Sequence, residues 1–320
     1  MSYEPPVKTR VRWGRVALFY AIALGWVSLI AALLYLANQR NLSGAAGPTV
    51  LTVVLALLYM PAPLVAALIV GRLDHRPALI RTTFQGFWRK LPKLIGVALT
   101  VIPALLLGMV GVSWVVGNLI GFDAAGTMLF THEDLVANTL TLVPGMNADQ
   151  VAAMGASVPP FWGLIGMAFL GAIVAGFTIN GLFAFGEEYG WRGWLADELR
   201  PLGAFWVNVI TGVLWGLWHA PLILMGFNYG EYTRLGPFFM VAWCVAASFL
   251  LWRAREVTGS LLAPAVLHGA INGFAGVFTV LLAGANPLVA VPMGVLGSGT
   301  VAVVAAVFWW LTRKRTQPAA

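Results

Sequence analysis

A few ionisable side chains stand at the edges of, or inside, long apolar stretches of this sequence, and they are the residues best suited to chemistry. Glu187 and Glu188 end one apolar stretch and are followed by Arg192. If a helix continues through this segment, Glu188 and Arg192 share a face and can pair in the favoured order, acid before base. Glu187 then points about 100° away, so it is free to act elsewhere. Taken alone, the cluster is equally typical of an ion cluster at the edge of a membrane.

Two further apolar stretches carry histidines. His219 lies two residues before Pro221, which interrupts the helical hydrogen bonds, and one turn after Trp215, which could form the wall of a pocket. His268 and Asn272 are four residues apart, so they share one helix face and can both donate to an oxygen between them. A buried histidine that only packs, and polar contacts that only join helices, are the alternatives.

Together these residues make up the equipment for amide hydrolysis. A carboxylate with a histidine can activate water, and a second histidine with an amide can stabilise an oxyanion. The sequence shows neither a serine or cysteine nucleophile motif nor the His-Glu-x-x-His motif of zinc peptidases. Zinc remains a candidate cofactor, and its ligands would be Glu187, His219 and His268.

The composition requires a lipid environment for these residues. Of the 320 residues, 60% are hydrophobic and 10% are charged, whereas soluble domains carry about 25% charged residues. The excess apolar surface must therefore face a lipid bilayer. The net charge of +7 comes from basic residues between apolar stretches, a pattern of membrane topology that does not indicate nucleic-acid binding. The single cysteine, Cys244, excludes an intrachain disulfide.

The predicted fold is an all-α polytopic bundle of transmembrane helices. A span needs about 20 apolar residues, and eight segments qualify. They are about 16–37, 49–70, 94–120, 161–186, 205–226, 235–252, 257–284 and 289–312.

The loops between these spans alternate in charge. Seventeen of the 19 Lys and Arg residues fall on one side, and only Arg40 and Arg234 fall on the other. Because the positive side is cytoplasmic, both termini are expected in the cytoplasm, and an even number of spans follows. We expect a multi-pass protein of the cell membrane, most simply a bacterial cytoplasmic membrane, with one large extracytoplasmic loop at about 121–160.

The three polar motifs, in this order, resemble the CPBP family of CAAX proteases and bacteriocin-processing enzymes, also called Abi proteins. That family carries Glu-Glu-x-x-x-Arg, Phe-x-x-x-His and His-x-x-x-Asn or Asp on successive membrane helices. The corresponding residues here are Glu187, Glu188 and Arg192, then Trp215 and His219, then His268 and Asn272. Trp215 departs from the usual Phe. The resemblance divides the chain into a membrane region at 1–160, catalytic helices at 161–285, and a last span with a basic tail at 286–320.

The resemblance implies an intramembrane endopeptidase, either glutamate-type or metal-dependent. Glu187 and His219 would activate water, and His268 and Asn272 would hold the oxyanion. Arg192 would orient the acidic pair, with Glu188 in support. The partner would be a membrane-associated peptide or protein, prenylated or bacteriocin-like, with no nucleic acid involved. The alternatives are a non-enzymatic immunity or scaffold protein and a small transporter that uses these residues as a proton relay.

Overall fold

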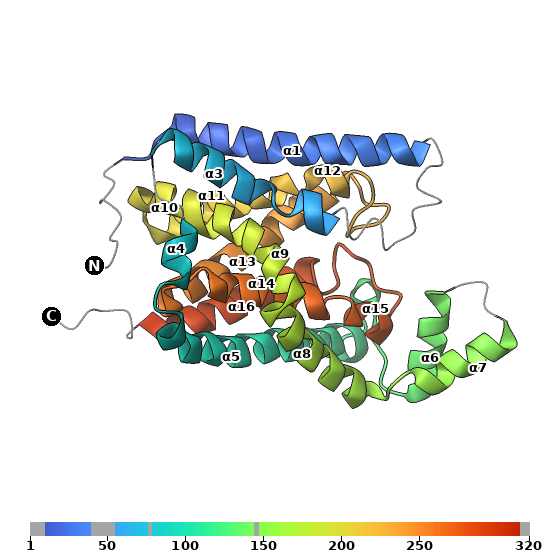
Figure 1. Cartoon of the computed structure of the whole chain (residues 1–320). Coiled ribbons are helices and arrows are strands. Elements are labelled where there is room, and N and C mark those ends of the chain that lie inside the picture. Colours follow the sequence, from blue (N-terminus) through green and yellow to red (C-terminus); the bar gives the residue numbers. More distant parts are fainter. Residues whose placement is uncertain (1–9, 40–54, 76–78, 144–146, 314–320) are drawn as a thin grey trace.

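The computed structural model describes residues 10–39, 55–75, 79–143 and 147–313, and these form a bundle of helices (Figure 1). The predicted all-α polytopic class is confirmed. The first half contains α1 (Trp13–Gln39), the π-helical turn η1 (Leu55–Tyr59), α3 (Ala62–Leu73), α4 (Leu79–Phe84), α5 (Phe87–Ser113), the π-helical η2 (Trp114–Leu119), the 3₁₀ turn η3 (Asp123–Ala125), α6 (His132–Thr141) and α7 (Ala148–Ser157).

The second half begins with α8 (Phe161–Phe177), α9 (Ile179–Glu188), the π-helical η4 (Tyr189–Leu195), α10 (Ala196–Leu199) and the 3₁₀ turn η5 (Arg200–Leu202). It continues with α11 (Gly203–Trp218), α12 (Ala220–Ile223), α13 (Gly236–Thr258), α14 (Leu262–Phe274), α15 (Val277–Leu281) and α16 (Val295–Thr312). Two short strands, β1 (Thr127–Met128) and β2 (Leu282–Ala283), pair antiparallel. They join the segment after α5 to the end of α15.

Several predicted spans are interrupted in the structure. The segment 161–186 is not one helix, because Thr178 leaves the helical conformation (φ −126°, ψ −120°) and separates α8 from α9. The segment 257–284 divides into α14 and α15, and the helix predicted at 289–312 begins only at Val295. Hydropathy alone could not reveal these breaks, because the breaking residues are themselves apolar or small.

Two other predicted spans also differ in detail. The predicted span 205–226 is broken after α11 ends at Trp218, where Pro221 removes an amide donor. The predicted span 49–70 begins outside the described residues, and its described part is η1 followed by α3. The predicted loop at 121–160 contains the two helices α6 and α7.

The number of membrane crossings remains a prediction. In the described part of the chain, 6 helical stretches are long and apolar enough to cross a bilayer, and a pair bent by 74°, Ala148–Ser157 with Phe161–Phe177, would bring the number to 7. The helical stretch Leu57–Leu73 is apolar but shorter. Eight crossings would require this short stretch and the bent pair each to count as a span.

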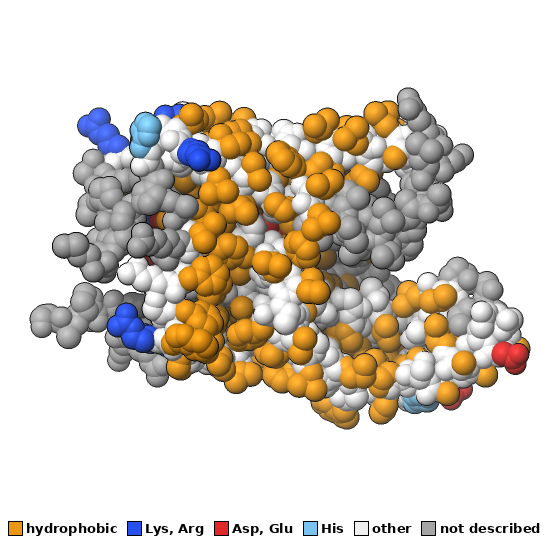
Figure 2. All heavy atoms as spheres, in the orientation of Figure 1, with side chains coloured by type: hydrophobic (Ala, Val, Ile, Leu, Met, Phe, Trp, Pro, Cys, Tyr) orange, Lys and Arg blue, Asp and Glu red, His pale blue; other side chains and the backbone are white. Residues whose placement is uncertain are grey.

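The ends of the bundle differ in charge. Helix α1 begins and helix α16 ends at the same end of the bundle, whereas α6 and α7 project at the other end (Figure 1). On the face shown in Figure 2, hydrophobic side chains cover the middle, Lys and Arg gather at the first end, and Asp and Glu mark the α6–α7 region. This distribution agrees with the charge pattern of the loops. The compartment that each end faces stays a prediction.

Ion pairs between partly exposed arginines and buried carboxylates join helices at the basic end. The Arg12 guanidinium lies 2.5 Å from Asp74 after α3 and 2.9 Å from Glu198 in α10, and Arg15 lies 2.9 Å from Asp74. The hydrogen bonds that Glu198 and Asp74 accept raise the pKa of Arg12 above its usual value. The start of α1 is thereby fixed against the segment that follows the π-helical η4.

Glycines allow the central helices to approach closely. A Cβ atom on Gly212 or Gly216 of α11 would lie 2.4 or 2.5 Å from backbone atoms of α13. A Cβ atom on Gly269 of α14 would lie 2.5 Å from the Gly181 nitrogen of α9, and one on Gly273 would lie 3.0 Å from Ala175 of α8. The Gly269 and Gly273 pair is a small-xxx-small pattern of the kind that favours close helix packing. These contacts bring the polar residues of α9, α11 and α14 together.

Candidate active site

The two glutamates lie in the interior of the bundle. Glu187 is 3% exposed and Glu188 is fully buried, which excludes a solvated ion cluster at the membrane edge. Helix α9 ends at Glu188, and the chain continues as the wider π-helix η4, a form that is frequent at functional sites. Close packing against the start of α3 is possible because Gly190 has no side chain: a Cβ atom there would lie 2.4 Å from Pro63.

Glu188 is the centre of a buried ion-pair network. Its Oε1 atom accepts hydrogen bonds from Arg192 Nη1 at 2.9 Å and from His268 Nδ1 at 2.9 Å. The second Arg192 nitrogen donates to Ser248 Oγ of α13 at 3.1 Å. The predicted pairing of Glu188 with Arg192 is therefore confirmed. Because Arg192 is only 1% exposed, the guanidinium and the carboxylate compensate each other's charge in a medium that would otherwise strongly disfavour both.

Glu187 faces a different partner. Its Oε2 atom accepts a hydrogen bond from the indole Nε1 of Trp215 at 2.8 Å. The two adjacent carboxylates thus point to different surroundings, as the 100° turn between neighbouring helical residues requires. Glu188 is held by the Arg192 cation and the His268 ring, and Glu187 is held by a neutral donor.

His219 occupies the break at the end of α11. Its Nδ1 atom lies 2.9 Å from the carbonyl oxygen of Trp215. Since a carbonyl can only accept, Nδ1 carries the proton, and in the neutral ring Nε2 is left as the acceptor. A histidine in this tautomer can take a proton from water through Nε2.

His268 also contacts the indole of Trp215. The ring of Trp215 is 5.7 Å from the ring of His219 and 5.3 Å from the ring of His268, and the Arg192 guanidinium lies 4.1 Å above it. His268 Nδ1 donates to Glu188, so Nε2 can donate to a substrate only when the ring is doubly protonated. The positive charge of that form would lie against the Glu188 carboxylate.

Asn272 is placed apart from these groups. It lies one turn after His268 in α14, as the spacing predicts, but it is exposed whereas His268 is buried. Within the described part of the chain, no hydrogen bond joins Asn272 to the other five predicted site residues. Of the remaining membrane asparagines, Asn180 donates to Gly269 O at 3.3 Å and Asn208 donates to Ala204 O at 2.8 Å. The Asn180 bond joins α9 to α14, whereas the Asn208 bond lies within α11.

The structure adds residues that the sequence analysis did not assign to the site. Trp215 was expected only as a wall, yet it donates to Glu187 and contacts both histidines. Ser248 accepts from Arg192, and Tyr59 donates to the carbonyl of Trp218 beside His219 at 2.8 Å. Nothing in the sequence marks Ser248 or Tyr59, because each is a common residue in an apolar stretch.

The site does not assemble a metal centre. Among the described residues, no group of three or more His, Cys, Asp and Glu side chains is placed to hold a metal ion. Glu187, His219 and His268 are therefore not gathered as a zinc ligand set in the described part of the chain.

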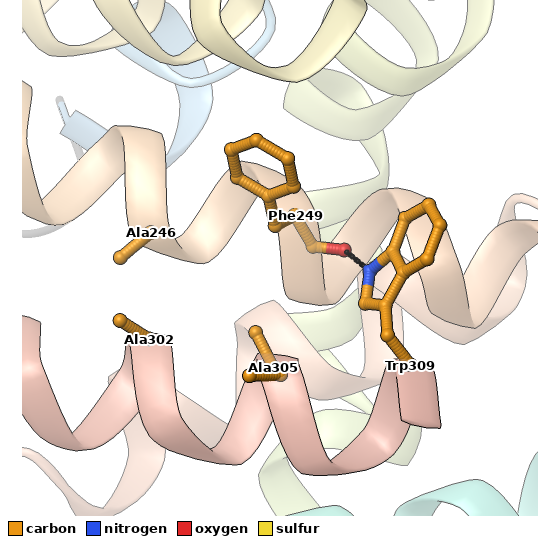
Figure 3. A pocket seen from close by; sticks show the side chains of 6 residues that line it. Ala246, Phe249, Ala302, Ala305 and Trp309 are labelled. Carbon is orange, nitrogen blue, oxygen red and sulfur yellow. Dashed lines mark hydrogen bonds between the residues drawn. The ribbon is translucent and has the colours of Figure 1, made fainter. Parts of the chain in front are cut away.

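A pocket elsewhere in the bundle has no chemical equipment. It is a hollow of about 180 Å³ between α13 and α16. Figure 3 shows Phe249 and Trp309 with small alanines at its wall, and Trp309 Nε1 donates to the Phe249 carbonyl at 3.0 Å. None of the six predicted site residues lines it.

The fold and the site define a polytopic membrane protein with a buried centre of carboxylates and histidines. Residues 159–274 match the sequence family described as type II CAAX prenyl endopeptidase Rce1-like, and all six predicted site residues lie in this range. This part of the chain is thus similar to the Rce1-like family, and the resemblance to the CPBP family of CAAX proteases is confirmed.

A curated relative agrees with this family. The chain is 27% identical over 92 residues to CAAX prenyl protease 2 of Methanococcus maripaludis. The match covers 27% of this chain and 34% of the relative, so the chain spans about a third of that protein. No solved structure matches the chain.

Proposed function

We propose that the chain is an intramembrane endopeptidase that hydrolyses a peptide bond of a membrane-associated substrate. One observation carries this proposal: Glu187, His219 and His268 meet around Trp215 inside an apolar bundle. Ionisable groups at membrane depth are expensive and are kept where they do chemistry. The match of residues 159–274 to the Rce1-like family supports the same reaction class.

In the proposed reaction, Glu187 and His219 remove a proton from water as it attacks the carbonyl carbon of the scissile bond. The proton then passes to the leaving amine when the carbon–nitrogen bond breaks, so acid and base roles are exchanged within one turnover. The negative charge on the carbonyl oxygen would be met by Nε2 of doubly protonated His268. Asn272 would contribute a second donor if the substrate or a rotation of its side chain brings it near.

The Glu188–Arg192 pair has a supporting role in this proposal. Glu188 fixes the His268 ring through Nδ1, and Arg192 lies on the indole that donates to Glu187. Both residues therefore orient the reacting groups and need not touch the substrate. The proposed substrate class is a lipid-modified peptide of the CAAX type, because the name of the curated relative specifies a prenyl protease.

The test is a cleavage assay in liposomes with a farnesylated CAAX-type peptide and the same peptide without the lipid. Glu187→Gln and His219→Ala should each lower the rate by about 10²–10⁴-fold. Asn272→Ala should leave measurable activity, because one oxyanion donor contributes about 10²–10³-fold at most. Glu256→Gln is the matched control, since this carboxylate is a partly exposed partner of Arg200 far along α13.

Each outcome has a defined meaning. Full activity in Glu187→Gln would refute the assignment of the base. Activity that is lost with a chelator and restored by zinc would transfer Glu187 and the histidines from water activation to metal ligation. A folded wild-type chain that cleaves neither peptide would favour a scaffold or transporter over this enzyme.

A further inference from the structure

The backbone at the end of α11 leaves carbonyl groups without their helical donors. In a continuous helix the His219 amide would donate to Trp215 O, but here it donates to Gly216 O at 3.2 Å. The Trp215 carbonyl is met instead by the His219 ring at 2.9 Å. The position of the His219 side chain therefore depends on the geometry of this break.

The carbonyl of Trp218, three residues after Trp215, has also lost its helical donor. The Leu222 amide, which would donate to Trp218 O in a continuous helix, donates to His219 O at 3.2 Å. An unpaired carbonyl in an apolar interior is costly. The phenol of Tyr59 supplies the missing donor, because its hydroxyl lies 2.8 Å from Trp218 O and its ring lies 4.5 Å from the Trp218 ring.

Tyr59 belongs to a segment that also contacts the helix bearing Glu187. It is 3% exposed and ends the π-helical turn η1. The next two residues, Met60 and Pro61, lie against Gly186, where an added Cβ atom would be 3.3 Å from Pro61 Cα. One short segment thus touches the break that carries His219 and the residue just before Glu187.

We propose that Tyr59 is a positioning residue, whose hydroxyl bond to Trp218 O holds the break in α11 and so keeps His219 in register with Glu187. This inference deepens the proposed function and rests on it for its catalytic consequence. The bond itself is independent of any substrate. Tyr59 does not need to touch the reacting atoms.

A matched pair of variants tests the inference. Tyr59→Phe removes the hydroxyl that bonds to Trp218 O. Tyr20→Phe removes another buried hydroxyl, which has no hydrogen-bond partner among the described residues. Hydrogen–deuterium exchange of the peptide that contains Leu222 and Ile223 should be roughly three- to tenfold faster in Tyr59→Phe, the range expected for one lost hydrogen bond, and unchanged in Tyr20→Phe.

Kinetics test the consequence for His219. A misplacement of about 1 Å can lower a rate by 10²-fold, so Tyr59→Phe should lower kcat at least about tenfold with KM changed less than twofold. In a His219→Ala background, the same change should have no further effect on the residual rate, because both act on one group. If Tyr59 served only the stability of the fold, Tyr59→Phe would lower the amount of folded protein, and its effect on the rate would add to that of His219→Ala.

The failures are distinguishable. Equal exchange rates in Tyr59→Phe and Tyr20→Phe would overturn the inference, whatever the activity. Faster exchange in Tyr59→Phe with an unchanged kcat would show that the break does not position His219, and would overturn it as well. A third outcome is that Tyr59→Phe exchanges faster but the wild-type protein cleaves no peptide. This outcome would support the bond between Tyr59 and the break in α11 and would refute the proposed function.

Discussion

Glu187 and Glu188 are adjacent and chemically identical, yet their replacement by glutamine should affect the stability of the fold very differently. Glu188→Gln removes the charge that compensates Arg192, which is 1% exposed. It also leaves one amide oxygen for two donors that both now bond Oε1 at 2.9 Å. Removing one partner of a buried ion pair lowers stability by about 3–5 kcal/mol, and this range is the expected loss.

Glu187→Gln should lower the free energy of unfolding by less than about 1 kcal/mol. The amide oxygen can still accept the Trp215 indole hydrogen, now 2.8 Å from Oε2, and a neutral hydrogen bond contributes about 0.5–1.5 kcal/mol. The assay is the free energy of unfolding of both variants by steric trapping in bilayers, with peptidase rate measured on the folded fraction. The reasoning is refuted if Glu188→Gln is within 1 kcal/mol of the wild type, or if the two variants lose the same stability.

Three further predictions use other parts of the molecule. Reporter fusions at Gly145 and at Arg200 should report opposite compartments, and the same compartment for both would contradict the predicted topology. Trp215→Phe should lower stability by about 2–4 kcal/mol in unfolding measurements, because it leaves a buried carboxylate oxygen without its donor and a gap beside it; a loss below 1 kcal/mol would count against the indole bond. Gly269→Ala should lower stability by about 1–3 kcal/mol, because its Cβ atom would meet the α9 backbone at 2.5 Å, whereas Gly276→Ala, with open space around it, should stay within about 0.5 kcal/mol. Equal stability of these two glycine variants would show that the α9–α14 contact tolerates separation.

The helical, membrane-spanning character of the fold could be predicted because apolar length is a strong local signal. What the sequence did not reveal is where the helices break. Thr178 lies between the apolar residues Phe177 and Ile179, and its non-helical backbone angles (φ −126°, ψ −120°) have no signal in hydropathy. Close glycine contacts are likewise not visible in the sequence, since Gly212 matters only because the α13 backbone lies against it.

The polar half of the site was predictable for a different reason. Charged and imidazole groups are rare at membrane depth, so their residue type alone marks them, and the spacing of Glu188 and Arg192 was sufficient to predict their pairing. Asn272 shows the limit of spacing. It shares a helix face with His268, yet one side chain is exposed and the other is buried, because the neighbouring helices cover only part of that face.

The aromatic half of the site could not be predicted, and the reason is the abundance of its residues. The chain contains 14 Trp and 7 Tyr, and each has one hydrogen-bond donor on a large apolar body. Which of these donors meets a carboxylate or an orphaned carbonyl depends on the rotation of helices and on where their backbones break. Trp215 donates to Glu187, and Tyr59 donates at the break beside His219, only because α9, α11 and η1 converge. In a site of this kind, the acids and bases can be identified from the sequence by their residue type. The donors that form hydrogen bonds to them are determined by tertiary packing alone.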